Sequence, residues 1–329
     1  MPLDAYTVTR PNAKNLGGDP LELVIEEFTG IVEGTIQRRS VTEGWLPVRS
    51  VKGTATVTNY AVGESTLQKI IPGQIPDGTT SAFSKNSVTI DRSIIARAAL
   101  PELDTFQTVF DARKQIGMEH GKKIAKLKDQ SFLIQGVKAA LSANSPYGTP
   151  LPNFTGGSIQ TLAAAGDKQD AAKLYDAFGG LFTKMEAKDV LPVDDDLVIF
   201  VRPDVFYTLL DAEQVINGEY VTSEGTSISG HIFKAFGVPV VSTNNLPNWV
   251  EAEATPGTVS AMMGPDYVGD FTKLVALAMS PKALLAGANI ELKTNAFFDD
   301  LSKCYFVDAW LAYASTPDRA EYAGAIYMP

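Results

Sequence analysis

Few side chains in this sequence have the type and spacing that catalysis requires. Residues 117–122 combine two glycines with a lysine, as a phosphate-binding loop would, but the glycines are too close together and the run lies within a predicted helix. Residues 225–230 contain glycines and serines without the Gly-x-Ser-x-Gly turn of a nucleophile elbow. The histidines, His120 and His231, are far apart in the sequence, and neither has an obvious acid or thiol partner. The sequence therefore predicts no catalytic constellation.

Metal coordination has equally little support. Asp194, Asp195 and Asp196 could bind a hard cation, but adjacent carboxylates point in different directions, so the run favours a solvated turn. Cys304 is the only cysteine, which excludes an intrachain disulfide and a cysteine-based zinc site, and its apolar neighbours favour a buried thiol. We expect no metal, no cofactor and no enzymatic activity.

The composition describes an ordinary globular chain. It has 329 residues, 45% of them hydrophobic and 20% charged, with 28 Lys+Arg against 38 Asp+Glu and a net charge of −10. This acidic balance argues against a general nucleic-acid binder. The most apolar stretch, residues 274–288, is interrupted by Pro281 and Lys282 and is shorter than the ~20 residues of a spanning helix. We expect a soluble protein without a signal peptide, made in a reducing cytoplasm.

The N-terminal part predicts two elements that need a partner. Asp19 and Pro20 are typical of a helix start. An apolar stripe at helical spacing follows, formed by Leu21, Val24, Ile25, Phe28, Val32 and Ile36. Nothing precedes this helix that could cover its stripe.

The second element is a long excursion between two predicted strands at residues 51–57 and 87–92. It covers roughly residues 60–86, far more than the ~2–5 residues of a compact hairpin loop. Near its tip are Ile70, Ile71 and Ile75. The excursion is either a flexible surface loop or an arm that docks on another subunit. We favour the arm, because an isolated hairpin buries too little surface to be stable alone and must therefore pack on something else.

A very long helix is predicted from residue 112 to residue 143, because this stretch lacks proline and has apolar residues at helical intervals. Its first half is basic, and Glu119 is spaced to pair with Lys123. The lysines, Lys122 and Lys126 among them, spread around the helix, which favours a solvated or subunit-facing surface over a nucleic-acid stripe.

The rest of the chain predicts a mixed α+β fold. Helices are expected over residues 169–187 and 203–210, and a loop over residues 217–230. Strands are expected over residues 197–201, 290–295, 303–315 and 323–327. A turn and strand are expected over residues 236–241, and a further turn at Asp299 and Asp300.

This order of parts resembles the major capsid proteins of tailed bacteriophages, which have the Hong Kong 97-type fold, and most of all their short-tailed (podovirus) branch. The resemblance rests on segments that look like the end of the arm helix, the returning strand of the extended loop, the spine helix and two axial-domain signatures. They are residues 33–41, 87–91, 111–140, 201–204 and 236–247.

The resemblance implies a division of the chain. Residues 1–50 would be an N-terminal arm and residues 51–92 an extended β-hairpin loop. Residues 93–190 and 283–310 would form a peripheral domain with a spine helix at about 112–143. Residues 191–282 and 311–329 would form an axial domain, with residues 217–230 near the symmetry axis.

The resemblance also implies a structural function. The chain would self-assemble as hexamers and pentamers into an icosahedral head around double-stranded DNA, bound without sequence specificity. A separate scaffolding protein and a portal protein at one vertex would be its partners, and no membrane is involved. The location would be the virion, after assembly in the bacterial host cytoplasm. Candidate intersubunit contacts are Phe28, Arg38, Arg39, Lys69, Ile70, Ile71, Ile75, Lys122, Lys126, Asp299 and Asp300.

Two alternatives stay open. An encapsulin-type nanocompartment shell would have the same fold without a scaffold. A hydrolase with an unrecognised site would lose turnover when Asp194, Asp195, His120 or His231 is replaced.

Overall fold

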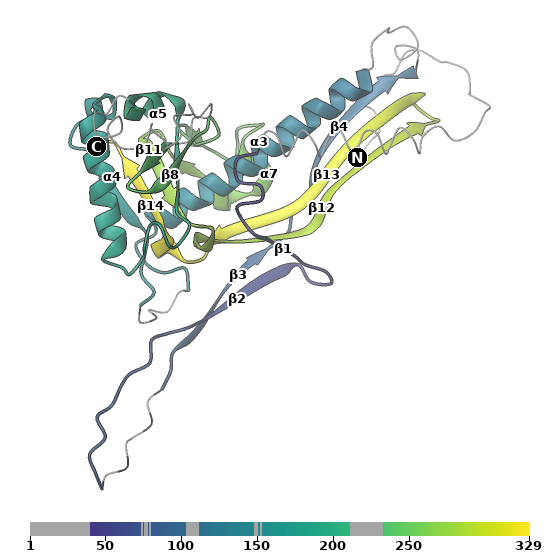
Figure 1. The fold of residues 1–329 in the computed structure, drawn as a ribbon. Coiled ribbons are helices and arrows are strands. Elements are labelled where there is room, and N and C mark those ends of the chain that lie inside the picture. The colour runs from purple at the N-terminus through teal and green to yellow at the C-terminus, as the bar shows by residue number, and fades with distance from the viewer. Residues whose placement is uncertain are drawn as a thin grey trace, which may run out of the picture.

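The computed structural model describes residues 40–73, 75, 78, 80–102, 112–147, 151, 153–210 and 233–329. Two β-sheets lie along one long helix, and a β-hairpin projects from the body formed by these elements (Figure 1). The predicted loop at residues 217–230 lies outside the described residues. No described helix is long and apolar enough to cross a membrane.

The long helix, α3, spans Ala112–Leu141 and confirms the predicted spine. Its C-terminal half is buried almost throughout, with Phe132, Leu133 and Ile134 at 1% exposure or less. Gly136 allows this close packing, because a Cβ there would lie 2.5 Å from the sulfur of Met279 on a neighbouring strand. The helix thus joins both sheets through one apolar core.

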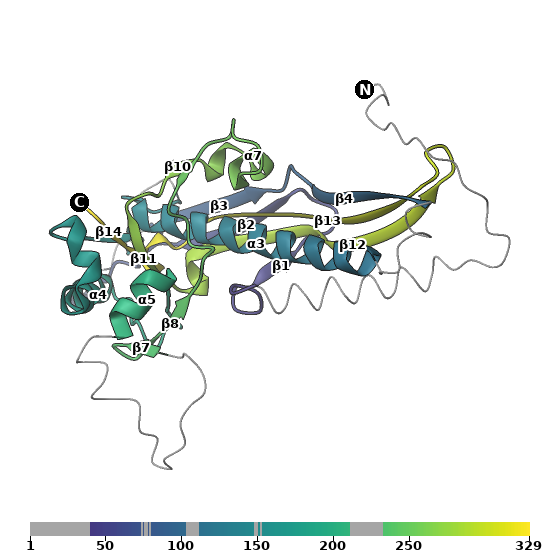
Figure 2. The same ribbon diagram turned by 90° about the horizontal axis from the view of Figure 1, so that it is seen from above.

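The first sheet has four strands in the order β1-β12-β13-β4. Its strands are β1 (Val48–Ser50), β4 (Ile94–Pro101), β12 (Leu284–Asp299) and β13 (Cys304–Pro317). β12 and β13 form a long antiparallel pair whose register shifts between Ala288 and Lys293. Register shifts of this kind bend a strand pair, and the pair curves along α3 in Figure 2.

The second sheet has six strands in the order β5-β14-β11-β6-β8-β7. They are β5 (Ser158–Thr161), β6 (Val198–Val201), β7 (Phe233–Ala235), β8 (Val238–Ser242), β11 (Leu274–Met279) and β14 (Ala323–Tyr327). The predicted turn and strand over residues 236–241 are confirmed: Phe236 and Gly237 have positive φ and form the turn between β7 and β8, and β8 begins at Val238.

Helices α4 (Ala171–Glu186) and α5 (Pro203–Leu210) cover the six-stranded sheet. Asp170 caps α4 by accepting hydrogen bonds from the backbone amides of Ala172 and Lys173. The apolar face of α4, including Phe178 and Leu181, is buried with β6 and β8. Residues 158–186 therefore pack with the six-stranded sheet, whereas the sequence grouped them with the long helix.

A small unit covers one side of α3 between the two sheets. It contains β9 (Val250–Glu251), α7 (Val259–Met263) and β10 (Gly269–Asp270). Short 3-10 helices complete the described chain at Ala165–Gln169, Pro265–Tyr267, Pro281–Ala283 and Ala320–Tyr322.

The projecting hairpin consists of β2 (Thr56–Val62) and β3 (Phe83–Thr89). The antiparallel ladder runs from the Thr56–Thr89 pair to the Val62–Phe83 pair. Both strands thus lie closer to the tip than predicted, and β4, which follows them, was not predicted as a strand. The hairpin extends far beyond the body, as the resemblance implied (Figure 1).

Candidate interaction surfaces

The root of the hairpin packs on the four-stranded sheet. Val57, Val88 and Ile90 form an apolar cluster with Leu285 of β12 and with β13. Strand β12 also carries Gly287, where a Cβ would lie 2.4 Å from a methyl group of Val57. A larger residue at position 287 would therefore displace the hairpin.

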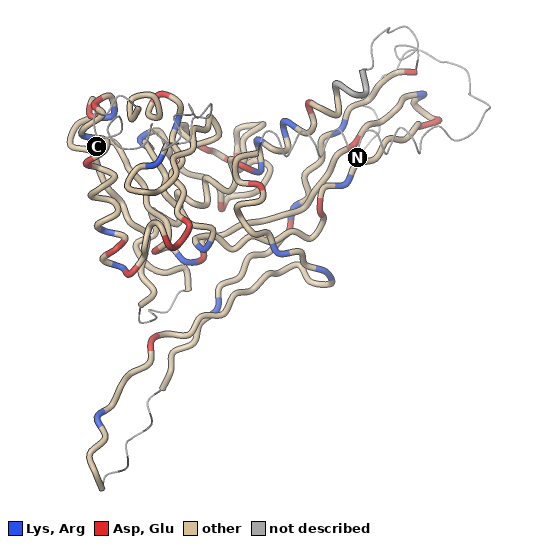
Figure 3. Tube along the Cα trace, in the orientation of Figure 1, with Lys and Arg blue, Asp and Glu red and all other residues tan. Residues whose placement is uncertain are grey.

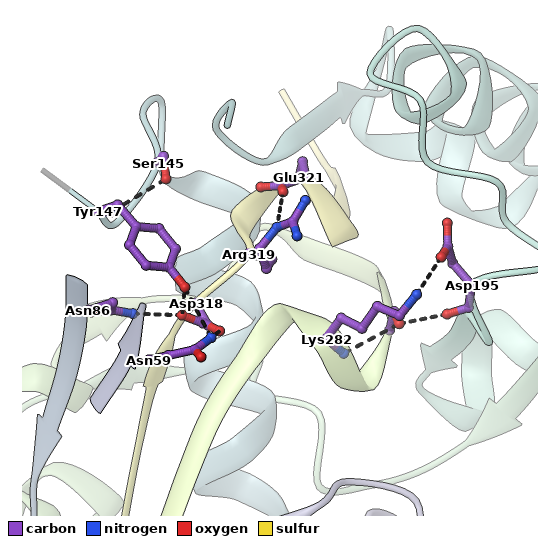
Figure 4. Close-up of polar contacts among 10 residues, drawn as sticks. Asn59, Asn86, Ser145, Tyr147, Asp195, Lys282, Asp318, Arg319 and Glu321 are labelled. Atoms are coloured by element: carbon purple, nitrogen blue, oxygen red, sulfur yellow. Dashed lines mark hydrogen bonds and ion pairs between the residues drawn. The ribbon is translucent and has the colours of Figure 1, made fainter. Parts of the chain in front are cut away.

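A buried carboxylate fixes the root further. Asp318, which follows β13 and is 5% exposed, accepts hydrogen bonds from Asn59 at 2.7 Å, Asn86 at 3.1 Å and the Tyr147 hydroxyl at 2.7 Å. Figure 4 shows these side chains converging from β2, β3 and the chain after α3. Burial and the Asp318 carboxylate raise the pKa of Tyr147 well above its usual range, so its hydroxyl stays protonated and donates.

Replacing Asp318 with alanine should loosen the hairpin root. The variant leaves three donors without their acceptor, so we expect about 1–3 kcal/mol lower unfolding free energy. Faster amide hydrogen exchange in β2 and β3, with little change in α4, is the measurement. Ser84→Ala, which removes one hydrogen bond from β3 to the carbonyl of Tyr147, is the control and should have a smaller effect. Equal exchange in wild type and Asp318→Ala would contradict the prediction.

The tip of the hairpin presents apolar side chains to solvent. Ile70, Ile71 and Ile75 are 71%, 49% and 95% exposed, and Lys69 beside them is also exposed. The sequence missed further members of this surface: Leu67 at the tip and, along the outer side of the ladder, Tyr60, Val62 and Phe83. Their alternation along β2 and pairing across to β3 could have identified them. Nothing in the described part of the subunit covers the tip.

A second projection is the turn between β12 and β13. Asp299 accepts hydrogen bonds from the amides of Leu301 and Ser302, and Asp300 pairs with Lys303 at 3.2 Å. The structure therefore places both predicted acids at a hairpin tip, where Leu301 is 92% exposed. Their part in intersubunit contact stays a prediction.

The predicted lysines lie on α3. Lys122 is partly exposed and Lys126 is exposed. The predicted pairing of Glu119 was wrong, because Glu119 contacts Lys122 at 2.9 Å, one residue before Lys123. Figure 3 shows basic segments along the half of α3 that runs beside β4.

The start of the described chain is tied to α3 by a feature that the sequence did not indicate. Asp129 is 0% exposed and accepts hydrogen bonds from the Ser40 hydroxyl, the Val41 amide and both the amide and hydroxyl of Thr42. Asn245, after β8, donates a further bond to it at 3.0 Å. Asp129 thus joins three distant segments. The predicted contacts Phe28, Arg38 and Arg39 lie outside the described residues.

The side chains that the sequence analysis considered for catalysis or metal binding do not come together in the structure. Asp195 is engaged in structure: it contacts Lys282 at 2.7 Å and accepts a hydrogen bond from the Leu191 amide, consistent with a turn. His120 lies half-buried on α3, and burial lowers its pKa. His231 lies outside the described residues. The described part of the chain holds no cluster of three or more potential metal ligands.

A comparison with known protein families identifies the family to which this chain belongs. Residues 80–290 match the Gp10A-like family, which is described as a major capsid protein. The chain belongs to this family of major capsid proteins. A search of curated proteins found no match.

Solved capsids show the same fold. This capsid protein is similar to the capsid of the cyanophage P-SCSP1u, with a TM-score of 0.75, 19% identity and 88% of each chain covered. The mature capsid of bacteriophage PhiM1 gives a TM-score of 0.72 and 22% identity, with 88% of this chain and 87% of that chain covered. The predicted Hong Kong 97-type α+β fold is thus confirmed.

A virus-like particle from Pyrococcus furiosus is less similar, with a TM-score of 0.54, 10% identity and coverage of 92% of this chain and 98% of that chain. The family match supports the capsid role, and the nanocompartment alternative is not better supported. The role of this capsid protein is structural.

Proposed function

We propose that this capsid protein assembles as hexamers and pentamers into an icosahedral head that encloses double-stranded DNA. The observation that carries the proposal is the projecting hairpin, whose isoleucines have no cover in the described part of the subunit. In rings built by head-to-tail contacts, such a surface meets a different surface of the next identical copy. Family membership supports the same reading.

The proposed contacts are distributed over the subunit. The hairpin tip, with Lys69, Ile70, Ile71 and Ile75, lies on a neighbour. The turn at Asp299 and Asp300 meets other copies near three-fold axes, and Lys122 and Lys126 face a subunit or solvent. Many modest contacts of this kind act together in a shell.

We also propose the division of the chain into an arm, an extended loop, a peripheral domain and an axial domain, with residues 158–186 moved to the axial part. The support for this change is the packing of α4 on the six-stranded sheet. The proposed partners are a separate scaffolding protein, a portal protein and DNA bound without sequence specificity. The acidic chain, with a net charge of −10, suits a container that must release DNA. Assembly takes place in the cytoplasm of the host of a short-tailed phage, and the role requires no catalytic turnover.

Expression of this chain with the scaffolding protein of its own phage tests the proposal. Electron microscopy should show closed shells, and particles of one or a few discrete diameters are the expected result. Protein that stays monomeric with and without the scaffold would contradict the proposal. Shells that form equally well without any scaffold, and that contain a co-purifying enzyme, would favour the nanocompartment instead.

A further inference from the structure

The described residues leave an apolar groove open between α3, β4 and the small unit that contains α7. The groove has a volume of about 650 Å³. Its apolar lining includes Ile95 of β4, Leu127 of α3, and Val259 and Met262 of α7. Ile95 and Met262 are 53% and 40% exposed, so part of this apolar surface contacts solvent in the single subunit.

The side of the groove that α3 forms is basic. Lys123 and Lys126 line it and are both exposed. Within the described ranges neither lysine has an ion pair, unlike Lys122 beside them, which contacts Glu119 at 2.9 Å. Glu251, the acid of the lining, is 1% exposed and accepts its hydrogen bonds within the small unit. The groove therefore favours an occupant that is both apolar and acidic.

The described chain presents an apolar surface of matching kind on the six-stranded sheet. It consists of the turn at residues 191–196, between α4 and β6, and of Phe236 in the turn between β7 and β8. Leu191, Val193 and Phe236 are 52%, 61% and 44% exposed. Val193 and Phe236 line the same pocket beside α4, so the two turns form one continuous surface.

Acidic side chains surround this apolar surface. Glu186 at the end of α4, Asp189, Asp194 and Asp196 are all exposed, and none of them has an ion pair within the described ranges. The two lysines of residues 184–188 donate to backbone carbonyls instead. We call residues 186–196 and Phe236 the acidic patch. Its apolar centre and acidic surroundings complement the apolar floor and basic side of the groove.

The groove and the acidic patch lie on opposite sides of the subunit. Figure 2 shows α7 on one side of α3 and the strands β7 and β8 on the other side. A single folded copy cannot bring these two surfaces together, so the complement of each is available only on a second copy. Contacts between two different surfaces of identical chains run head to tail, and they form a ring where the rotation between copies closes.

We propose that the acidic patch of one copy binds in the groove between α3, β4 and α7 of the next copy. Val193 covers Met262, and Glu186 and Asp194 lie beside the two lysines of the groove. The contact rests on the assembly proposed above, and it names the two surfaces through which neighbours in one ring meet. It is separate from the contact made by the hairpin tip.

Disulfide trapping in assembled shells tests this contact. The native thiol of Cys304 is 0% exposed, so engineered cysteines can react selectively. Val193→Cys combined with Met262→Cys should link different chains on mild oxidation and give dimers and longer oligomers on non-reducing gels. Gln169→Cys combined with Met262→Cys is the matched comparison. Residue 169 is exposed but lies at the other end of α4, a helix about 24 Å long, so this pair should not link.

The outcomes separate this contact from the proposed shell. Shells in which positions 193 and 262 do not link, link within one chain, or link no faster than positions 169 and 262 would overturn the contact and leave the proposed function standing. Failure of the parent chain to form shells with its scaffolding protein would overturn both.

A charge exchange tests the electrostatic part without engineered cysteines. Lys123→Glu combined with Lys126→Glu places like charges on the two surfaces and should lower the shell yield about tenfold. Adding Glu186→Lys and Asp194→Lys to this variant restores opposite charges and should recover most of the yield. Electron microscopy of assembly reactions measures both effects.

The control makes the same change in net charge away from both surfaces. Lys52→Glu combined with Lys168→Glu should leave the shell yield unchanged, because neither lysine belongs to the groove or to the acidic patch. A wild-type yield in the variant with Lys123 and Lys126 replaced would overturn the proposal, and so would a failure of the reciprocal lysines to recover the yield.

Discussion

Replacing Asp129 with alanine should lower the unfolding free energy of the subunit by about 3–5 kcal/mol. The carboxylate is fully buried and accepts bonds from Ser40, Val41, Thr42 and Asn245. Alanine would leave the amides of Val41 and Thr42 and the Asn245 side chain without this acceptor in a buried or partly buried site. Since unsatisfied buried donors each cost about 1–3 kcal/mol, several together exceed the effect of most single substitutions.

Denaturant unfolding of the unassembled protein measures this effect. Asp129→Asn should be intermediate, because the amide keeps one acceptor oxygen but turns an NH₂ group toward donors. Asp300→Ala is the control, because that side chain is 70% exposed and should change stability by about 0.5 kcal/mol or less. A loss below about 1 kcal/mol in Asp129→Ala would refute the assignment of Asp129 as an anchor.

Substituting aspartate for the three isoleucines of the hairpin tip should abolish shells while leaving the subunit folded. Ile70, Ile71 and Ile75 contact water in the isolated subunit, so their replacement changes its stability by about 0.5 kcal/mol or less at each position. Burying three unpaired carboxylates against a neighbour would cost far more than one hairpin contact contributes. We expect at least a tenfold lower shell yield.

The measurement combines electron microscopy of assembly reactions with thermal unfolding of the unassembled protein. The matched control replaces the same three isoleucines with leucine, which keeps the apolar surface and should keep shell formation. Wild-type shell yield in the aspartate variant would show that the tip is not a contact. Loss of folding in that variant would show instead that the tip packs on its own subunit.

The elements that depend on local pattern could be predicted from the sequence. The absence of proline and the helical spacing of apolar residues gave α3 to within two residues of its end at Leu141. The last strand, Ala323–Tyr327, and the turn at Asp299 were also predicted. These features are decided within a few residues of chain, where periodicity and turn chemistry apply.

Features that depend on pairing between distant segments could not be predicted. Asp129 lies 89 residues from Ser40, and Tyr147 lies 171 residues from Asp318, so no local spacing indicates these bonds. The position of β3 follows from its ladder with β2, which continues to Phe83. The packing of α4 likewise depends on which sheet its apolar face meets, and either sheet would have satisfied its pattern.

The β12–β13 pair has a consequence for how copies can adapt to one another. One end of this pair carries the turn with Leu301, and Asp318, which holds the hairpin root, directly follows the other end. The length of the β12–β13 pair therefore sets the distance between the turn with Leu301 and the root of the β2–β3 hairpin. In the proposed shell, we expect adjustment to neighbours at different angles to come from the hairpin beyond the Val62–Phe83 pair, where the ladder stops.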